Sequence, residues 1–179
     1  MESKKPNKVV FLDRDGVINK DTHYLYKISD FQFQPGIINI CLYLLKLDYQ
    51  LIVTTNQSGI ARGYYNEKDF FKLNNWMIAE LAQQGVKILD VFFCPHAPGA
   101  NCSCRKPKPG MLIDASNKHN ISLENSWMIG DRNTDIKAAN AAGVNNTILL
   151  SSHNNMEAYA TGFNHTISSI SYVKNIITK

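Results

Sequence analysis

Two aspartates that follow an apolar run are the first residues of this chain whose types and spacing suggest chemistry. The run at residues 9–12 precedes Asp13 and Asp15, and Gly16 follows them. Residues i and i+2 of an extended chain point to the same side, about 6.5 Å apart, so both carboxylates can meet one small ligand while Arg14 points elsewhere. One carboxylate could attack phosphorus while the other carries a proton to the leaving oxygen. Alone, the pair is equally compatible with solvated acids in a turn.

A second apolar run, at residues 51–53, also ends in polar residues and a glycine. The residues that follow it are Thr54-Thr55-Asn56-Gln57-Ser58-Gly59. A hydroxyl and exposed backbone N–H groups at a strand end can cradle phosphate oxygens. We select Thr55 as that hydroxyl, with Thr54 as the alternative. A polar loop that only leads into a helix would have the same composition, so this segment decides nothing by itself.

Three of the four cysteines lie with a histidine in a loop rich in proline and glycine. Three thiolates and one imidazole make a closed tetrahedral zinc site, with no position left for chemistry. One residue separates the members of each pair, which is tighter than the spacing of common zinc fingers. Buried core thiols are the alternative, and such a loop is a poor place for them. We therefore predict structural Zn²⁺ on Cys94, His96, Cys102 and Cys104, and assign Cys41 to the core.

Two further segments could complete a phosphate site. Arg105 and Lys106 directly follow the last thiol, where bound zinc would hold both cations in place. A lysine near Asp13 would neutralise phosphoryl oxygens and the aspartate itself. Another apolar run ends at Asp131, whose carboxylate could join the oxygen ligands of a hard cation. Asp135 could orient the lysine or stabilise the start of a helix, and the sequence favours neither role.

The elements that must position these groups alternate between strand and helix, which indicates a doubly wound, Rossmann-like parallel α/β sheet. Ligands bind such sheets beyond the carboxyl ends of the strands, where these segments fall. We expect a loop at residues 20–34 and, after residue 150, a helix, a short strand near residues 163–167 and a last helix. The other predicted strands are residues 9–12, 50–54, 87–93, 126–129 and 147–150, and the helices are 35–47, 67–84, 110–119 and 134–142.

Composition and charge describe an ordinary globular protein. The 179 residues are 44% hydrophobic and 19% charged, which suits one domain with a full core, with residues 1–7 as a flexible tail. The net charge of +4 is mild and forms no basic stripe, so no nucleic-acid partner is expected. No apolar segment is long enough for a signal peptide or a membrane span. We therefore expect a cytoplasmic monomer without membrane contact, whose thiols stay reduced.

Taken together, the motifs resemble the haloacid dehalogenase superfamily of phosphatases. Its motifs occur in order as Asp13-Arg14-Asp15-Gly16, Thr55-Asn56-Gln57-Ser58-Gly59, Arg105-Lys106-Pro107 and Gly130-Asp131 with Asp135. The cysteine loop and Ile60-Ala61-Arg62-Gly63 make the chain similar to the D-glycero-D-manno-heptose 1,7-bisphosphate 7-phosphatases, enzymes of lipopolysaccharide precursor synthesis. The similarity runs over about residues 9–150. It implies a haloacid dehalogenase-type sheet on which the zinc-stabilised loop stands in for a large cap domain.

The resemblance implies a role for each matching residue. Asp13 would be the nucleophile and Asp15 the acid/base, while Thr55 and Lys106 bind the phosphoryl group. Mg²⁺ would be bound by Asp13, Asp131 and the backbone carbonyl of Asp15. Contacts to the substrate, a small phosphorylated sugar, would come from Asp21, Thr22, His23, Tyr24, Asn56, Gln57, Ser58, Arg105 and Arg132.

Two features resemble the histidinol-phosphate phosphatases instead. These are the short gap between His96 and Cys102, and Arg132 where the heptose family commonly has a lysine. A polynucleotide 3′-phosphatase shares the Thr-Asn-Gln-x-Gly motif but normally lacks this zinc loop. A non-catalytic, zinc-containing phosphate-binding module would require one of the four segments to be lost, and none is. These alternatives stay open at this point.

Charge near the site favours a substrate with two phosphates. Arg62, Arg105 and Arg132 supply cations for a second phosphate. Histidinol phosphate carries an amine instead, and Asp21 is the one obvious acid for it. We therefore predict hydrolysis of the 7-phosphate of heptose 1,7-bisphosphate, and the sequence does not indicate which anomer is preferred.

Overall fold

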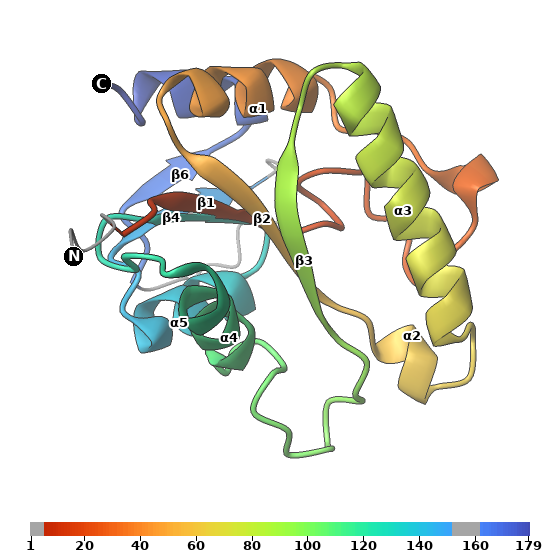
Figure 1. Ribbon diagram of the computed structural model, residues 1–179. Helices are drawn as coiled ribbons and strands as arrows, with labels where there is room; N and C mark the ends of the chain where they lie inside the picture. The colour runs from red at the N-terminus through yellow and green to blue at the C-terminus, as the bar shows by residue number, and fades with distance from the viewer. Residues whose placement is uncertain (1–5, 152–161) are drawn as a thin grey trace, which may run out of the picture.

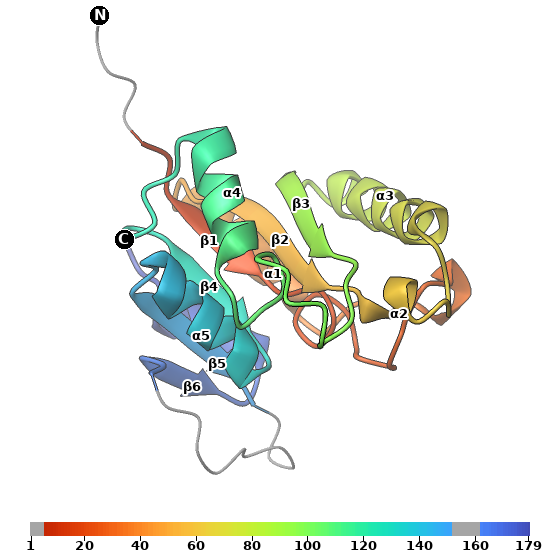
Figure 2. The same ribbon diagram turned by 90° about the horizontal axis from the view of Figure 1, so that it is seen from below.

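The computed structural model describes residues 6–151 and 162–179, which form a six-stranded parallel sheet between two layers of helices (Figure 1; Figure 2). The strands lie in the order β3-β2-β1-β4-β5-β6, and every neighbouring pair is parallel. This confirms the predicted doubly wound α/β fold. The strands are β1 (Val9–Leu12), β2 (Gln50–Asn56), β3 (Ile88–Cys94), β4 (Trp127–Gly130), β5 (Asn146–Leu150) and β6 (His165–Ile167).

Helices cover both faces of the sheet, as Figure 1 shows. On one face lie α1 (Ile37–Lys46), α3 (Glu67–Gln83) and the 3₁₀ helix η2 (Ile170–Asn175). On the other face lie α4 (Gly110–His119) and α5 (Asn133–Ala142). Two short helices, η1 (Ile28–Asp30) and α2 (Ser58–Ala61), lie in the connections.

Strand β1 supplies side chains to both faces because alternate residues of a strand point in opposite directions. Val10 and Leu12 pack in the core cluster under α1 and α3, whereas Val9 and Phe11 pack in the cluster under α4 and α5. All four side chains are fully buried. The short unbroken apolar run of the sequence is therefore a central strand covered on both faces.

The strand order reverses beside β1, which is where a doubly wound sheet opens a crevice for ligands. The chain winds from β1 out to β3, then crosses back and continues from β4 to β6. Leu12 of β1 pairs with Val53 of β2 and with Ile129 of β4. Beyond this level β4 continues to Gly130 and β2 to Asn56, and the segments that follow the three strands emerge at the same edge of the sheet.

The strand and helix boundaries agree with those expected from the sequence within two residues at each end. Two differences concern short elements. The sequence does not predict α2, because four residues carry no usable periodicity, and the last predicted helix is a 3₁₀ helix. The helix expected just after residue 150 lies outside the described residues.

Of the segment predicted as a flexible tail, only Pro6 and Asn7 lie within the described residues. The Asn7 N–H donates to the carbonyl of Asn120 at 2.9 Å, and Asn7 forms a bridge with Ile121. Within residues 6–151 and 162–179, no helix is long and apolar enough to cross a membrane. No separate cap domain lies over the carboxyl edge of the sheet within the same residues.

Candidate active site

The segments that follow β1, β2 and β4, together with the thiol loop, line one cleft at the carboxyl edge of the sheet. The cleft has a volume of about 420 Å³. Among its lining residues are Asp13, Asp15, Thr55 and Lys106, which the sequence predicts to act on phosphate. Asp131 lies against the turn after β1, since a β-carbon at Gly16 would overlap its carboxylate.

Lys106 is buried among the carboxylates of this cleft. Its Nζ donates to Asp13 Oδ1 at 2.8 Å, to Asp135 Oδ1 at 2.6 Å and to the carbonyl of Thr54 at 2.7 Å. These contacts use all three donors of the ammonium group. Burial alone would lower the pKa of Lys106, but the charges of Asp13 and Asp135 outweigh it and raise that pKa above its ordinary value. Lys106 therefore remains a cation that neutralises Asp13.

Asn56 holds the backbone of Lys106 in place from the end of β2. Its Oδ1 accepts from the Lys106 N–H at 3.1 Å, and its Nδ2 donates to the Lys106 carbonyl at 3.1 Å. Because the two bonds join one side chain to the peptide units on both sides of Lys106, they fix the position and the orientation of the loop. The sequence predicts Asn56 only as a substrate contact, so this link is a finding of the structure.

The acidic cluster, defined as Asp13, Asp131 and Asp135, has a surplus of negative charge. One carboxylate oxygen from each residue lies within 4.8 Å of those of the other two, and Asp13 and Asp135 pair with the single ammonium of Lys106. Burial raises the pKa of Asp13, and burial together with the charge of Asp135 raises the pKa of Asp131 to about 7. Asp131 Oδ1 is buried and has no hydrogen-bond partner among the described residues. A divalent cation that prefers oxygen ligands fits both the open acceptor and the charge.

Asp135 performs both of the roles between which the sequence does not choose. Its Oδ1 pairs with Lys106, and its Oδ2 accepts from the Arg132 N–H at 3.0 Å at the start of α5. A β-carbon at Gly130 would overlap the Asp135 side chain, so the glycine provides the room for it. Since both oxygens of Asp135 are engaged, the other two carboxylates are better placed as cation ligands.

Asp15 is held by donors on every side. Arg14 is fully buried, and its Nη2 donates to Asp15 Oδ1 at 3.0 Å and to Oδ2 at 2.9 Å. Asn19 Nδ2 donates to Oδ1 at 3.0 Å, and Gln57 Nε2 donates to Oδ2 at 2.9 Å. The sequence predicts that Arg14 points elsewhere, and its side chain does enter the interior, but the pairing with Asp15 was missed. A charged residue inside an otherwise buried motif was the available signal.

Thr55 lines the cleft, as predicted, and Thr54 does not. Thr54 is fully buried, and its Oγ1 has no hydrogen-bond partner among the described residues. Thr55 Oγ1 accepts from Gln57 Nε2 at 2.8 Å, and Gln57 Oε1 accepts from Tyr65 Oη at 2.5 Å. The amide of Gln57 is thus engaged by protein groups. Tyr65 lines the cleft but belongs to no motif, so sequence reasoning missed it.

The predicted substrate loop forms one rim of the cleft. Asp21 Oδ1 accepts from the His23 N–H at 2.9 Å, and Asp21 Oδ2 pairs with Arg132 Nη2 at 2.7 Å. His23 and Tyr24 both have left-handed backbone conformations, with φ of 59° and 52°. Asp21, His23, Tyr24 and Arg132 line the cleft, whereas Thr22 is not among its lining residues.

The remaining rim residues come from the second strand end and the thiol loop. Asn56, Ser58 and Arg105 line the cleft as predicted, and Arg62 joins them. The Arg62 guanidinium lies 6.0 Å from the centre of the Tyr24 ring. Among the described residues, neither Arg62 nor Arg105 has an ion-pair partner.

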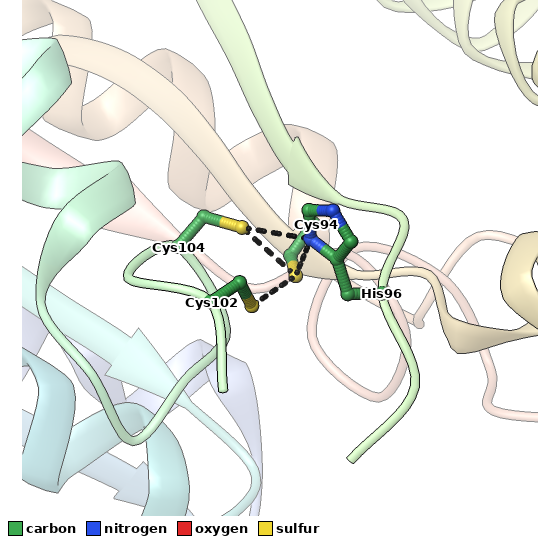
Figure 3. A group of neighbouring side chains, drawn as sticks. All are labelled: Cys94, His96, Cys102 and Cys104. Atoms are coloured by element: carbon green, nitrogen blue, oxygen red, sulfur yellow. Dashed lines mark hydrogen bonds between the residues drawn. The ribbon is translucent and has the colours of Figure 1, made fainter. Parts of the chain in front are cut away.

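The predicted zinc ligands converge from two ends of the loop, as Figure 3 shows. The Cys94 sulfur lies 3.1 Å from that of Cys104 and 3.6 Å from that of Cys102. His96 Nδ1 lies 3.5 Å from the Cys94 sulfur and 3.3 Å from the Cys104 sulfur. Bonds of about 2.3 Å to sulfur and 2.0–2.1 Å to nitrogen would hold tetrahedral ligands about 3.5–3.8 Å apart. The thiol cluster, defined by these four residues, therefore fits Zn²⁺.

The three thiols of the cluster differ in their electrostatics. Burial and the neighbouring thiols raise the pKa of Cys104 to about 12, and burial raises the pKa of Cys94. Burial alone would raise the pKa of Cys102, but a hydrogen bond from the Arg105 N–H and the neighbouring thiols lower it to about 7. Zinc binds the thiolate form. Arg105 also donates from Nη1 to the His96 carbonyl at 3.2 Å, so its guanidinium is tied to the loop.

Sequence comparison finds close relatives. Residues 103–170 match the HAD-hydrolase-like family. The D-glycero-alpha-D-manno-heptose-1,7-bisphosphate 7-phosphatase of Campylobacter jejuni is 50% identical over 143 residues, which are 80% of this chain and 82% of that protein. The D-glycero-beta-D-manno-heptose-1,7-bisphosphate 7-phosphatase of Helicobacter pylori strain 26695 is 46% identical over 145 residues, which are 80% and 84% of the two chains.

A comparison with solved structures finds the same kind of protein as the sequence comparison. The crystal structure of D,D-heptose 1,7-bisphosphate phosphatase from B. bronchiseptica, complexed with magnesium and phosphate, superimposes with a TM-score of 0.83. The two chains are 31% identical, and the match covers 93% of this chain and 95% of that one. The similarity therefore extends over the sheet, its helices and the cleft.

Proposed function

Because this chain belongs to the heptose-1,7-bisphosphate 7-phosphatases of the haloacid dehalogenase-like hydrolases, we propose that it removes the 7-phosphate of D-glycero-D-manno-heptose 1,7-bisphosphate. One observation carries the proposal beyond family membership. One cleft is lined by Asp13, Thr55 and Lys106, which come from segments far apart in the chain, and Asp13 also belongs to the acidic cluster. A phosphate-binding module would need the donors but not a carboxylate in position to attack.

The reaction would proceed in two steps on Asp13. Its carboxylate attacks phosphorus while the bond between phosphorus and the sugar oxygen breaks, which forms an aspartyl-phosphate. Asp15 gives a proton to the leaving oxygen, then takes one from the water that attacks the intermediate. Phosphate leaves and the Asp13 carboxylate is restored. Thr55 would donate its hydroxyl hydrogen to a phosphoryl oxygen in both steps. Lys106, whose three donors are engaged by protein groups, would stabilise the phosphoryl oxygens by its charge.

The two clusters would hold different ions. Asp13, Asp131 and the Asp15 carbonyl would hold Mg²⁺, which screens the charges of carboxylate and phosphate from each other. Cys94, His96, Cys102 and Cys104 would hold Zn²⁺ without an open position, so its role is structural. Arg105 and Lys106 directly follow the last of these ligands, so bound zinc would help to hold both residues at the cleft.

The rim of the cleft supports a bisphosphate over histidinol phosphate. Asp21, the acid that an amine would need, already pairs with Arg132 at 2.7 Å. Arg62 and Arg105 have no ion-pair partner among the described residues and can take a second phosphate. Of the three arginines that the sequence offers for a second phosphate, Arg132 is thus already paired, and Arg62 and Arg105 are the better candidates.

The proposed substrate also suggests where and in which pathway the protein would act. Such a phosphatase would act on a small phosphorylated sugar in the cytoplasm, as a monomer, in the synthesis of lipopolysaccharide or nucleotide-heptose precursors. The mild charge of the chain supports the absence of a nucleic-acid partner. The relatives divide between the alpha and beta anomers in their names, so the anomer is left to experiment.

A phosphate-release assay with Mg²⁺ tests the proposal on four substrates: both anomers of the heptose bisphosphate, histidinol phosphate and a 3′-phosphorylated oligonucleotide. We expect kcat/KM for at least one heptose anomer well above the values for the other two compounds. A preference for histidinol phosphate would mean that the short zinc loop and Arg132 were the better guides. Turnover of none of the four would favour the binding module.

A further inference from the structure

A buried hydrogen-bond relay connects Tyr65 to two groups of the proposed reaction. Tyr65 Oη lies 2.5 Å from Gln57 Oε1, and Gln57 Nε2 lies 2.9 Å from Asp15 Oδ2 and 2.8 Å from Thr55 Oγ1. We propose that Tyr65 is a positioning residue that orients the amide of Gln57, and through it the acid/base Asp15 and the hydroxyl of Thr55. The inference rests on the proposed function and assigns Gln57 a role other than substrate contact.

The relay has a direction because its members differ in what they can donate. Once Asp15 has given its proton to the leaving oxygen, its carboxylate only accepts, so the nitrogen of the Gln57 amide must then face Asp15. A flipped amide would place its oxygen against Asp15 Oδ2, which would then accept from Arg14 alone, and would withdraw the amide donor from Thr55 Oγ1. The Tyr65 hydroxyl opposes that flip by donating to the amide oxygen. Burial raises the pKa of Tyr65 to about 12, so the hydroxyl keeps its proton at neutral pH.

The direction of the relay determines where the Thr55 hydroxyl donates. Thr55 Oγ1 accepts one hydrogen from Gln57, and a hydroxyl has only one hydrogen of its own. That hydrogen is therefore left for another acceptor, and Thr55 lines the cleft in which a phosphoryl oxygen would lie. Without Tyr65 the amide could turn, and Thr55 could then donate to Gln57 instead of to phosphate.

The surroundings of Tyr65 hold its hydroxyl in place. The side chain is 6% exposed, and its ring stacks on Tyr26 at a centroid distance of 5.2 Å. A β-carbon at Gly59 would overlap the Tyr65 ring, so the chain needs glycine there for the hydroxyl to reach Gln57. Gln57 is 3% exposed, which keeps water from replacing the relay.

Tyr65→Phe tests the inference because it removes only the hydroxyl. On the heptose bisphosphate we expect kcat to fall about tenfold with KM changed less than about twofold, the size of effect that one lost buried hydrogen bond gives. On p-nitrophenyl phosphate the fall should be smaller, because its weakly basic leaving group needs little help from an acid. Tyr26→Phe is the matched control, since no hydrogen bond of its hydroxyl is part of the relay, and it should behave as wild type.

Gln57→Glu provides a second variant, in which a carboxylate of similar size replaces the amide and cannot donate when ionised. We expect a larger fall in kcat than for Tyr65→Phe, and the double variant should be no worse than Gln57→Glu alone. Wild-type kcat in Tyr65→Phe, equal falls on both substrates, or additive losses would each overturn the relay. If wild type does not hydrolyse the heptose bisphosphate, the proposed function fails. The relay is then judged on the alkyl phosphate that wild type hydrolyses fastest.

Discussion

The acidic cluster and the thiol cluster both gather metal-binding side chains, but the chain assembles them in opposite ways. Asp13 and Asp131 come from the ends of adjacent strands that lie more than a hundred residues apart in sequence. The four thiol-cluster ligands all lie within residues 94–104. The acidic cluster is thus positioned by the rigid sheet. In the thiol cluster only Cys94, at the end of β3, is held by the sheet, and the other three ligands lie in a loop that needs the ion for rigidity.

The two clusters also differ in what they leave open. Asp131 Oδ1 has no partner among the described residues, while the thiol cluster offers exactly the four ligands that fill a tetrahedral ion. A catalytic metal site keeps a ligand position open for substrate, whereas a structural metal site has all its positions filled by protein ligands. The following predictions test that separation.

The largest effect is expected for Asp13→Asn. The amide keeps the shape of the side chain but is a poor nucleophile, so kcat should fall by at least about a thousandfold. Phosphate release measures the loss, and elemental analysis should still find about one zinc per chain. The exposed Asp114→Asn serves as the control. Normal turnover in Asp13→Asn would remove the enzymatic proposal, and loss of zinc would show that the two clusters are not independent.

Lys106→Ala should cost about a hundred- to a thousandfold in kcat, because a preorganised cation is lost from the phosphoryl site. It should also lower the free energy of unfolding by about 3–5 kcal/mol, since Asp13 and Asp135 stay buried without their partner. Denaturant unfolding and phosphate release measure the two effects. Lys108→Ala, two residues along the same loop, should change neither. A variant as active as wild type would mean that the charge of Lys106 is not used.

Cys104→Ala should remove zinc and lower kcat indirectly, by about tenfold, because Arg105 and Lys106 lose their fixed position. Elemental analysis, Tm and phosphate release follow the change, and added Mg²⁺ should not restore the activity. Cys41→Ala removes a core thiol outside the cluster and should retain zinc. Wild-type protein that contains no zinc when purified without chelator would contradict the structural-ion assignment.

The smallest effect is expected for Asp90→Asn, which tests a carboxylate whose charge is already balanced. Asp90 Oδ2 lies 2.8 Å from Lys118 Nζ and 2.7 Å from His119 Nε2, and Asp90 belongs to neither cluster. The variant should change stability by less than about 1 kcal/mol at neutral pH and leave the magnesium requirement and zinc content as in wild type.

The pH dependence of this effect has a definite sign. Burial alone would raise the pKa of Asp90, but hydrogen bonds from Lys118 and His119 outweigh it and lower that pKa. The stabilisation is therefore complete above the unfolded-state pKa of about 3.9 and is lost as the pH falls through the lower folded-state value. The free energies of unfolding of wild type and Asp90→Asn should therefore become equal at acid pH. A difference that persists there would assign the effect to packing instead.

Much of the fold and of the candidate site can be predicted from the sequence, for reasons visible in particular residues. The run at residues 9–12 is apolar throughout because β1 is covered on both faces. Parallel strands end at one edge, so the polar residues after such runs must meet there. The thiol cluster was predictable for a different reason, since its ligands are close neighbours in the chain and their chemistry is specific to metal.

Other features could not be predicted because they depend on which side chains meet across distant elements. Asn56 anchors Lys106, Arg132 pairs with Asp21, and both bonds join residues more than forty positions apart. The sequence shows these residues as polar and near the site, but not which partner satisfies each of them. That choice is made by the register of the strands and the path of the loops.

The sequence by itself determined that polar residues gather at the carboxyl edge of a parallel sheet, which acidic and thiol side chains lie near one another, and the class of reaction. Residue type and strand periodicity carry that information. Only the tertiary structure decided the rest: that Asp135 serves both Lys106 and α5, that Arg14 pairs with Asp15, and that Tyr65 reaches Gln57 over Gly59. The physical reason is that a hydrogen bond is decided by tenths of an ångström and by the direction of the donor. Those quantities exist only once the chain is packed.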